Sequence, residues 1–265
     1  MQPLRDEIVP EPDLSLVMPC YNEEEAVGYT IPRLVGAFQR AGYRLQLVAV
    51  DNGSSDATGR ELARLARDYR EVEPSRVAVN QGYGYGILQG FPLCRAPWVG
   101  YIPADGQVDA EDVVRLFEAA RSTSGLVVAK ARRRFRLDGL LRKIVSVSYN
   151  VFARILWPRL GSIDVNGTPK LLRRELLEEL DLQSHDWLLD PELMIKAHYL
   201  GARVMEFNVF GRMRGTGLSH VRASTCLAFF VELLRLRFSR RLPQWRRTRG
   251  PAAEEPAPML VSGRE

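Results

Sequence analysis

Residues 14–56 read LSLVMPCYNEEEAVGYTIPRLVGAFQRAGYRLQLVAVDNGSSD, and this segment indicates the class of the fold. Short apolar runs at Leu14–Met18 and Leu45–Val50 have the length and composition of buried strands. The apolar residues of Ala26–Arg40, between them, recur at helical spacing. Strands joined through a helix run parallel, so the segment predicts a β-α-β unit.

The same alternation continues along the chain. Further strands are predicted at Val77–Val79, Trp98–Ile102, Leu126–Ala129 and Val204–Val209. Further helices are predicted from Ser55 or Asp56 to Tyr69, and at Ala110–Arg121, Leu137–Trp157, Arg174–Leu182, Glu192–Leu200 and Thr225–Phe238, with a loop at Gly161–Lys170. This pattern predicts an α/β fold, a mainly parallel sheet covered by helices on both faces.

Composition excludes several classes of protein. The chain has 265 residues, of which 46% are hydrophobic and 26% charged, so it can bury a large core and is not disordered in bulk. The cysteines, Cys20, Cys94 and Cys226, form no close pair, which argues against a structural zinc site and a disulfide framework. The first residues resemble no signal peptide and no run has the length of a membrane span, so we expect a soluble body.

Positive charge is concentrated in two windows. Residues 130–143 hold seven Lys or Arg against one acid, and residues 222–249 hold eight Arg against one acid, within a net charge of +5. Such windows suit anionic partners, which include nucleic acid, an anionic membrane and phosphates. Arginines outnumber lysines 33 to 4, which a codon-biased genome or arginine's bidentate grip on phosphate would explain.

Polar turns follow the first four predicted strands. They are Tyr21-Asn22-Glu23, Asp51-Asn52-Gly53-Ser54, Asn80-Gln81-Gly82 and Asp105-Gly106-Gln107. In a parallel sheet these turns leave at one edge, where α/β proteins bind ligands. A binding edge is therefore predicted, against the alternative of ordinary loop polarity. Asp51 could accept hydrogen bonds from a base or ribose, or could simply hold a tight turn.

The glycines of residues 82–90 match neither the dinucleotide fingerprint nor a P-loop. Nicotinamide redox chemistry and P-loop hydrolysis therefore lose their main support. Gly82, Gly86 and Gly90 share one helical face, which would admit a ligand or a close-packed backbone.

In their order and spacing these motifs resemble the family-2 inverting glycosyltransferases with the GT-A (Rossmann-like) fold. The likeness runs from Leu14 to Arg222 and is greatest to the polyprenyl-phosphate branch, which is similar to dolichol-phosphate mannose synthase. The resemblance implies that the donor, a nucleoside diphosphate sugar, is bound by the polar turns. The implied donor residues are Pro19, Tyr21, Asn22, Glu23, Asp51, Asn52, Gly82, Asp105 and Gln107.

The resemblance also implies a divalent metal, Mg²⁺ or Mn²⁺, at Asp105 and Gln107. Asp105 matches the last aspartate of the family's Asp-x-Asp motif, but Pro103 stands where the first is expected, and Asn52 replaces an acid common in the second motif. Hard cations accept several waters, so Asp105 with the diphosphate oxygens could still hold the ion.

Three downstream segments resemble the acceptor side of the family. The loop Asp164–Thr168 precedes Arg173 and Arg174, and Asp190-Pro191-Glu192 resembles an acidic motif at the catalytic crevice. Asp190 could also cap a helix that starts at Pro191. In the third segment the implied acceptor-binding residues are Arg212, Arg214, Ser219 and His220. His220 replaces a lysine and is only partly charged at neutral pH, so Arg212, Arg214 and Arg222 would carry more of the phosphate binding.

The expected activity is displacement at an anomeric carbon, with Asp105 and Arg214 helping to stabilise the leaving diphosphate. A phosphate acceptor needs no strong base, whereas a hydroxyl acceptor would need Asp190 or Glu192. We expect a polyprenyl phosphate acceptor at the cytoplasmic face of the membrane, and no nucleic acid partner. The alternatives are a soluble or cell-wall hydroxyl acceptor, and a nucleotide-sugar-binding protein without catalysis.

Three regions are predicted along the chain. They are a GT-A domain at 1–222, an amphipathic basic helix at 223–242 and a disordered tail at 243–265. Leu and Phe beside arginines suit that helix to an anionic membrane surface, or to packing on the core or on a second subunit.

Overall fold

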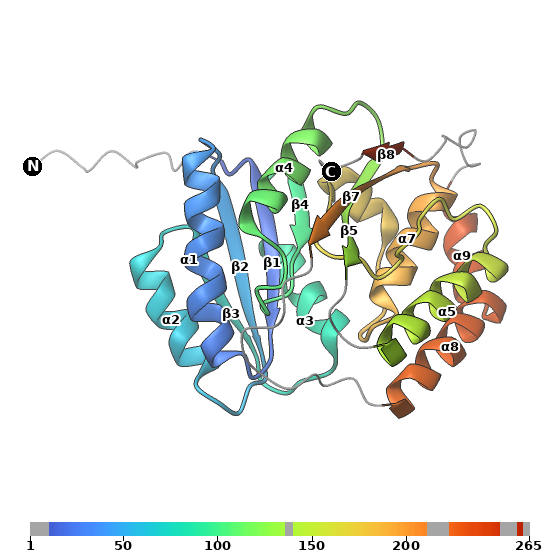
Figure 1. Cartoon of the computed structure of the whole chain (residues 1–265), viewed down its shortest axis with the longest axis horizontal. Coiled ribbons are helices and arrows are strands. Elements are labelled where there is room, and N and C mark those ends of the chain that lie inside the picture. The colour runs from blue at the N-terminus through green and yellow to red at the C-terminus, as the bar shows by residue number, and fades with distance from the viewer. Residues whose placement is uncertain (1–10, 136–139, 211–222, 250–258, 262–265) are drawn as a thin grey trace, which may run out of the picture.

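A computed structural model describes residues 11–135, 140–210, 223–249 and 259–261. In this part of the chain an eight-stranded sheet has the order β3-β2-β1-β4-β6-β5-β7-β8 (Figure 1). Only β6, among these strands, runs antiparallel to its neighbours. The strands are β1 Leu14–Cys20, β2 Leu45–Asn52, β3 Val72–Val77, β4 Trp98–Tyr101, β5 Val127–Phe135, β6 Lys170–Arg173, β7 Arg203–Phe210 and β8 Met259–Val261.

Helices cover both faces of the sheet, as predicted. The helices are α1 Glu24–Arg40, α2 Thr58–Asp68, α3 Tyr83–Gly90, α4 Ala110–Arg121, α5 Leu140–Leu156, α6 Arg174–Leu180, α7 Leu189–Tyr199, α8 Ala223–Phe238 and α9 Arg241–Arg247, with a 3-10 turn at Phe91–Leu93. One core joins α1, α2 and α4 to alternate residues of β1 and β2, and a second joins α3 and α5–α9 to the other face. A strand that is buried on both faces has a continuous run of apolar residues, and this is why β1 and β2 could be predicted from the sequence. No helix in the described ranges has the length and apolarity needed to cross a membrane.

Two strand predictions are wrong. The strand predicted at Val77–Val79 lies at Val72–Val77, on the sheet edge, where Pro74 is tolerated and only one side of the strand is paired. β6 falls at the end of the predicted loop 161–170 and beyond it. It is four residues long and begins with a lysine, so it lacks the apolar run of a parallel strand.

The tail predicted as disordered from residue 243 begins inside a helix. α9 spans Arg241–Arg247, and Trp245 is buried with its indole N–H donating to the carbonyl of Glu179 at 3.3 Å. Burial of an indole stabilises an otherwise polar segment. β8 lies in the same predicted tail and pairs with β7.

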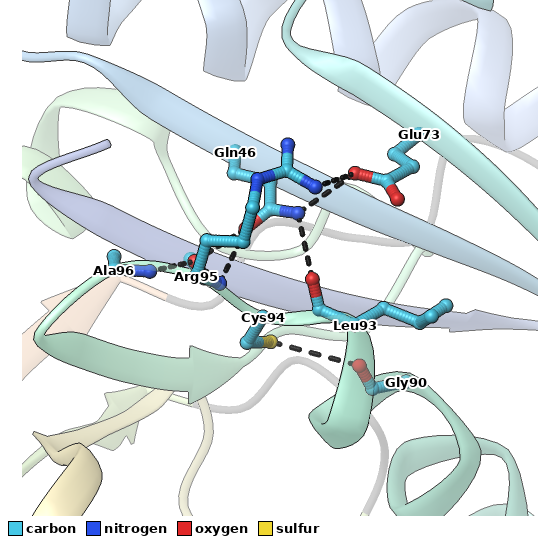
Figure 2. Close-up of polar contacts among 8 residues, drawn as sticks. Gln46, Glu73, Gly90, Leu93, Cys94, Arg95 and Ala96 are labelled. Carbon is cyan, nitrogen blue, oxygen red and sulfur yellow. Dashed lines mark hydrogen bonds and ion pairs between the residues drawn. The ribbon is translucent and has the colours of Figure 1, made fainter. Parts of the chain in front are cut away.

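A polar cluster centred on the buried Ser15 and Gln46 links the amino-terminal ends of the strands (Figure 2). The Ser15 hydroxyl donates to Gln46 Oε1 at 2.6 Å, and the Gln46 amide donates to Glu73 at 2.8 Å and to the Leu93 carbonyl at 2.9 Å. The backbone N–H of Arg95 donates to Gln46 Oε1 at 2.9 Å. The cluster ties β1, β2 and β3 to the entry of β4, far along the strands from the polar turns.

The glycines of α3 are explained by packing. A Cβ at Gly82 or Gly84 would collide with the carbonyls of residues 184–186, and one at Gly90 with Val17 and Val50. The backbone N–H of Tyr85 donates to the His185 carbonyl at 2.7 Å. Close packing therefore explains Gly82, Gly84 and Gly90, and the approach of a ligand to this helical face stays a prediction.

We predict that Gly84→Ala destabilises the fold by about 1–3 kcal/mol, because its Cβ would lie 2.7 Å from the Asp186 carbonyl and nearer still to that of Ser184. The matched control is Gly28→Ala in α1, where a Cβ meets only the flexible end of Glu61 at 3.2 Å. That change should be neutral or stabilising by roughly 0.5–1 kcal/mol. Urea unfolding measures both; equal effects of the two substitutions would contradict the packing.

Candidate active site

The carboxyl edge of the sheet gathers the turns that follow β1, β2 and β4. β1 lies between β2 and β4, with Cys20 opposite Asp51 and Val17 opposite Tyr101, and all three strands are parallel. The backbone N–H of Ile102 extends the ladder by donating to the Val17 carbonyl at 2.9 Å. These three turns therefore leave the sheet side by side, and β3, parallel to β2 with Val77 opposite Asn52, leads the fourth predicted turn, residues 80–82, from the same edge.

Hydrogen bonds join the turn after β1 to the turn after β2. The Asn22 N–H donates to Ser54 Oγ at 3.1 Å, and Asn22 Oδ1 accepts the N–H of Ser55 at 2.9 Å. The Glu23 N–H donates to Thr58 Oγ1 at 2.9 Å. Asn22 has a φ of 53°, a left-handed conformation that asparagine tolerates better than most residues. These contacts explain Asn22 without a ligand and give the edge a fixed shape.

Asp51 and Asn52 are buried and hold neighbouring turns. Asp51 Oδ1 accepts the N–H of Ser54 at 2.9 Å, and Oδ2 lies 3.6 Å from Arg76 Nε. The Asn52 amide donates to the Gly82 carbonyl at 2.9 Å, which links the turn after β2 to the start of α3. Asp51 thus holds a tight turn, which is one of the two roles that the sequence allowed for it. A role in donor binding remains a prediction for both residues.

Tyr21 and Pro19 also lie at this edge of the sheet, with Tyr21 towards solvent and Pro19 towards α3. The Tyr21 side chain is 38% exposed at the rim. Pro19 is half-buried, and its Cβ would lie 3.3 Å from a Cβ at Gly86. Pro19 therefore packs directly against α3 at Gly86.

Asp105 lies in the loop after β4, on the other side of β1. Asp105 Oδ1 accepts the N–H of Gln107 at 3.2 Å, and both residues are partly exposed. The Thr30 hydroxyl of α1 donates to the Ala104 carbonyl at 2.9 Å, and Gly106 has a φ of 66° with its α-carbon against Thr30. α1 thus positions the predicted metal-binding loop.

No group of three or more His, Cys, Asp or Glu in the described ranges is arranged to hold a metal. Asp105 and Gln107 offer one carboxylate and one side-chain amide two residues apart in the same loop. These groups fit a cation that carries most of its ligands as water and phosphate oxygens.

Asp190 is part of a buried ion pair that the sequence did not reveal. Lys170 Nζ donates to Asp190 Oδ1, and the Tyr101 hydroxyl donates to the same oxygen at 2.5 Å. Lys170 and Tyr101 are 0% exposed and Asp190 is 3% exposed. Burial lowers the pKa of Lys170 to about 8, and the Asp190 carboxylate opposes the shift by favouring the charged lysine. Burial and the Asp190 charge raise the pKa of Tyr101.

Asp190 is not the helix cap that the sequence allowed. Leu188 occupies the cap position, and α7 begins one residue before Asp190, with Asp186 Oδ1 accepting the Leu188 N–H at 2.8 Å. The carboxylate of Asp190 therefore does not cap the helix and forms the ion pair with Lys170 instead.

A second buried ion pair lies directly beside the first. Lys130 faces Lys170 across β5 and β6, and Lys130 Nζ lies 3.3 Å from Glu206 Oε1 of β7. Glu206 also accepts the Ser162 hydroxyl at 2.7 Å. Burial alone would raise the pKa of Glu206, but Lys130 and these hydrogen bonds hold it below its ordinary value. The Lys130–Glu206 pair anchors the 161–170 loop to the sheet through Ser162 and Ile163, and the Lys170–Asp190 pair joins β6 to α7.

Glu192 has structural partners. It lies 2.7 Å from Lys196 one turn along α7, and it accepts the backbone N–H of Ser184 at 2.8 Å. Burial alone would raise its pKa, but Lys196 and Ser184 lower it below the ordinary value. Glu192 thus fastens the segment before α7, and Asp190 is the better candidate of the two for chemistry.

Four predicted acceptor residues, Arg212, Arg214, Ser219 and His220, lie outside the described residues. Their roles stay predictions. Cys20 and Cys94 are buried free thiols, and burial raises the pKa of both, to about 12 for Cys94, so neither is a reactive thiolate.

The sequence model described as "Glycosyl transferase family 2" matches residues 15–181. The chain belongs to this family. The match covers β1 to α6 and all of the polar turns described above. The predicted resemblance is thereby confirmed.

Relatives named for lipid phosphates are similar to parts of this family-2 chain. An undecaprenyl-phosphate 4-deoxy-4-formamido-L-arabinose transferase of Pectobacterium carotovorum is 34% identical over 144 residues, which are 54% of this chain and 43% of that protein. A dolichol-phosphate mannosyltransferase of Pyrococcus furiosus is 26% identical over 231 residues, 84% of this chain and 63% of that protein. The chain thus matches less than half the length of the first relative and under two thirds of the second.

The fold has a counterpart among solved structures. Glucosyl-3-phosphoglycerate synthase of Mycobacterium tuberculosis, in complex with Mn²⁺, uridine diphosphate and glucosyl-3-phosphoglycerate, superposes with a TM-score of 0.65 at 19% identity, over 85% of this chain and 80% of that one. The predicted GT-A fold is confirmed at this level.

We predict that Lys170→Met and Asp190→Leu each destabilise the protein by about 3–5 kcal/mol, because each leaves one buried charge unpaired. The double variant should recover most of that loss, because it buries neither charge. Urea unfolding of the four proteins gives the coupling. Arg64→Met, in the exposed pair with Glu61, is the control and should cost less than about 1 kcal/mol. Additive losses in the double variant would show that the two groups do not act as a pair.

Proposed function

We propose that this family-2 chain transfers a sugar from a nucleoside diphosphate sugar to a polyprenyl phosphate. The observation that carries the proposal is the carboxyl edge of the sheet, where hydrogen bonds join the turns after β1 and β2 and Asp105 follows β4. A fixed polar edge of this kind is where α/β folds bind nucleotides. The names of the relatives support the acceptor class.

The donor would lie along that edge. Tyr21, Glu23 and Asp51 would surround the base and ribose, with Pro19 as the wall towards α3. Asn22, Asn52 and Gly82 would keep the turns in place, because their polar groups already bond one another across the turns. The diphosphate would extend towards Asp105 and Gln107 on the far side of β1.

A divalent cation would be held by Asp105 and the donor's own phosphate oxygens. Mg²⁺ and Mn²⁺ fit one carboxylate, one amide and a diphosphate, because both prefer oxygen ligands and keep several waters. Such an ion would stabilise the negative charge that develops on the leaving diphosphate. Asp105 is proposed to hold the cation next to the leaving diphosphate. Arg214 is proposed to stabilise the same negative charge from the acceptor side.

Occupied carboxylates favour a phosphate acceptor over a hydroxyl acceptor. A hydroxyl would need a base, yet Asp190 accepts from Lys170 and Tyr101, and Glu192 is paired with Lys196 and Ser184. A phosphate monoester arrives as an anion and needs no strong base. Asp190 would then set the charge and position of Lys170, and Arg212, Arg214, Ser219 and His220 would bind the phosphate.

An apolar cavity near Asp190 supports a lipid acceptor. It lies between α5, α8 and the segment before α7, with a volume of about 180 Å³, and is lined by Tyr149, Asp186, Trp187, Leu188, Ala228, Phe229 and Glu232. Trp187 stacks on Tyr83 of α3 at 4.6 Å and contacts Phe229 of α8. The cavity thus adjoins the elements that form the site. We propose that the protein acts at the inner face of the cell membrane.

Product formation on matched acceptors tests the proposal. The full chain is incubated in detergent with nucleoside diphosphate sugars, Mn²⁺ and either a polyprenyl phosphate or the corresponding polyprenol, and the lipid product is measured by mass spectrometry. We expect a sugar on the phosphate and none on the alcohol. Asp105→Asn should lower the rate by about 10²–10³-fold, and Asp68→Asn in α2, which is half exposed, should not.

Two results would overturn the proposal. Transfer to the alcohol or to a soluble hydroxyl would favour the alternative acceptor class. Tight donor binding with no product on any acceptor would favour a nucleotide-sugar-binding protein.

A further inference from the structure

A second cavity lies where the carboxyl ends of α5, α7 and α8 meet, on the side of the sheet that these three helices cover (Figure 1). We call it the α7-end cavity. Its volume is about 210 Å³, and the basic and aromatic side chains that line it are those of Trp157, Arg159, His198, Tyr199 and Arg237. None of the described residues that line it is acidic. The α7-end cavity is therefore basic, unlike the apolar cavity near Asp190.

The α7-end cavity is separate from the candidate active site. Asp190 lies at the start of α7 and His198 near its end, so the two residues are about 12 Å apart along the helix axis. The two cavities share no lining residue among those described. A ligand of the α7-end cavity would therefore occupy a place that neither the proposed donor nor the proposed acceptor uses.

Two arginines at this cavity have aromatic rings as their partners. The guanidinium of Arg237 lies 5.9 Å over the ring of Trp157, and that of Arg246 in α9 lies 4.2 Å over the ring of Tyr199. Neither arginine forms an ion pair with a described residue. Stacking on a ring positions a guanidinium and leaves its N–H groups available to an oxyanion.

Trp157 adds a buried donor without an acceptor. Its side chain is 4% exposed, and its indole N–H has no hydrogen-bond partner among the described residues. The buried indole of Trp245, by comparison, donates to the carbonyl of Glu179. A buried donor that is left unpaired costs about 1–3 kcal/mol, so an acceptor in the adjoining cavity would be stabilised by this group.

Neutralisation of the helix ends does not account for these observations. The carboxyl end of a helix carries about half a negative charge, so three such ends offset about one and a half positive charges. Arg237 and Arg246 alone supply two. Both arginines also lie in the basic window 222–249, which the sequence indicated for an anionic partner. A helix dipole gives no reason, moreover, for a buried N–H without an acceptor.

We propose that the α7-end cavity binds the phosphate group of a small water-soluble molecule. Guanidinium groups and an indole N–H are all donors, and phosphate offers several charged oxygens to them at once. The cavity is large enough to hold an inorganic phosphate together with water. The inference goes beyond the proposed function and does not depend on it.

Calorimetric titration with inorganic phosphate tests the α7-end cavity. The full chain is titrated in a chloride buffer without donor, acceptor or divalent metal. We expect Arg237→Gln to weaken phosphate binding about tenfold, because it removes a charged donor. Trp157→Phe keeps a ring and removes the N–H, and should weaken binding about fivefold. Arg235→Gln is the matched control, because it removes the same charge from the same helix at a residue that does not line the cavity, and it should bind as the parent does.

Three results would overturn the inference. The first is an absence of phosphate binding, or binding that Arg237→Gln and Trp157→Phe leave unchanged. The second is equal weakening by Arg235→Gln and Arg237→Gln, which would indicate unspecific attraction to a basic surface. The third is binding to vesicles that contain phosphatidic acid without binding of free phosphate, which would assign the cavity to a lipid headgroup. Unaltered thermal melting shows that each variant is folded.

Discussion

The parallel pairing of β1 with both β2 and β4 is the constraint on which the candidate site depends. With Cys20 opposite Asp51 and Val17 opposite Tyr101, turns that are some thirty and eighty residues apart in the chain leave the sheet at one edge. A strand has a period of two, so a slip of one residue in β1 would turn its buried side chains to the opposite face. Burial on both faces of the sheet therefore fixes the position of the polar turns as firmly as it fixes the core.

The two halves of the site are held by different interactions. Backbone and side-chain hydrogen bonds between turns shape the polar edge, as between Asn22 and Ser54. Buried ion pairs shape the other half, where Lys170 meets Asp190 and Lys130 meets Glu206. Losing one hydrogen bond between these partly buried turns costs less than leaving a buried charge without its partner. We therefore expect single substitutions at the ion pairs to destabilise the protein more than single substitutions at the polar turns.

Most of the fold, and the gathering of the polar turns at one edge of the sheet, could be predicted from the sequence. Apolar runs such as Leu45–Val50 indicate strands that are buried on both faces, and polar turns follow these runs in the sequence. β6 and the Lys170–Asp190 pair could not, because lysine and aspartate ordinarily indicate a surface, and pairing across 20 residues leaves no periodic signal. One signal was present: the chain has 4 lysines against 33 arginines, and Lys130, Lys170 and Lys196 are all buried. In an arginine-rich chain, each lysine was a candidate for the interior.

A crystal structure of the protein with Mn²⁺ and a nucleoside diphosphate tests the central claim most directly, since manganese is located by its anomalous scattering. The account predicts the nucleotide along the turns of Tyr21 and Asp51, with one manganese between its diphosphate and Asp105, and no manganese at that place when the nucleotide is omitted. A nucleotide bound away from the carboxyl edge, or manganese held at a different group of residues, would contradict it.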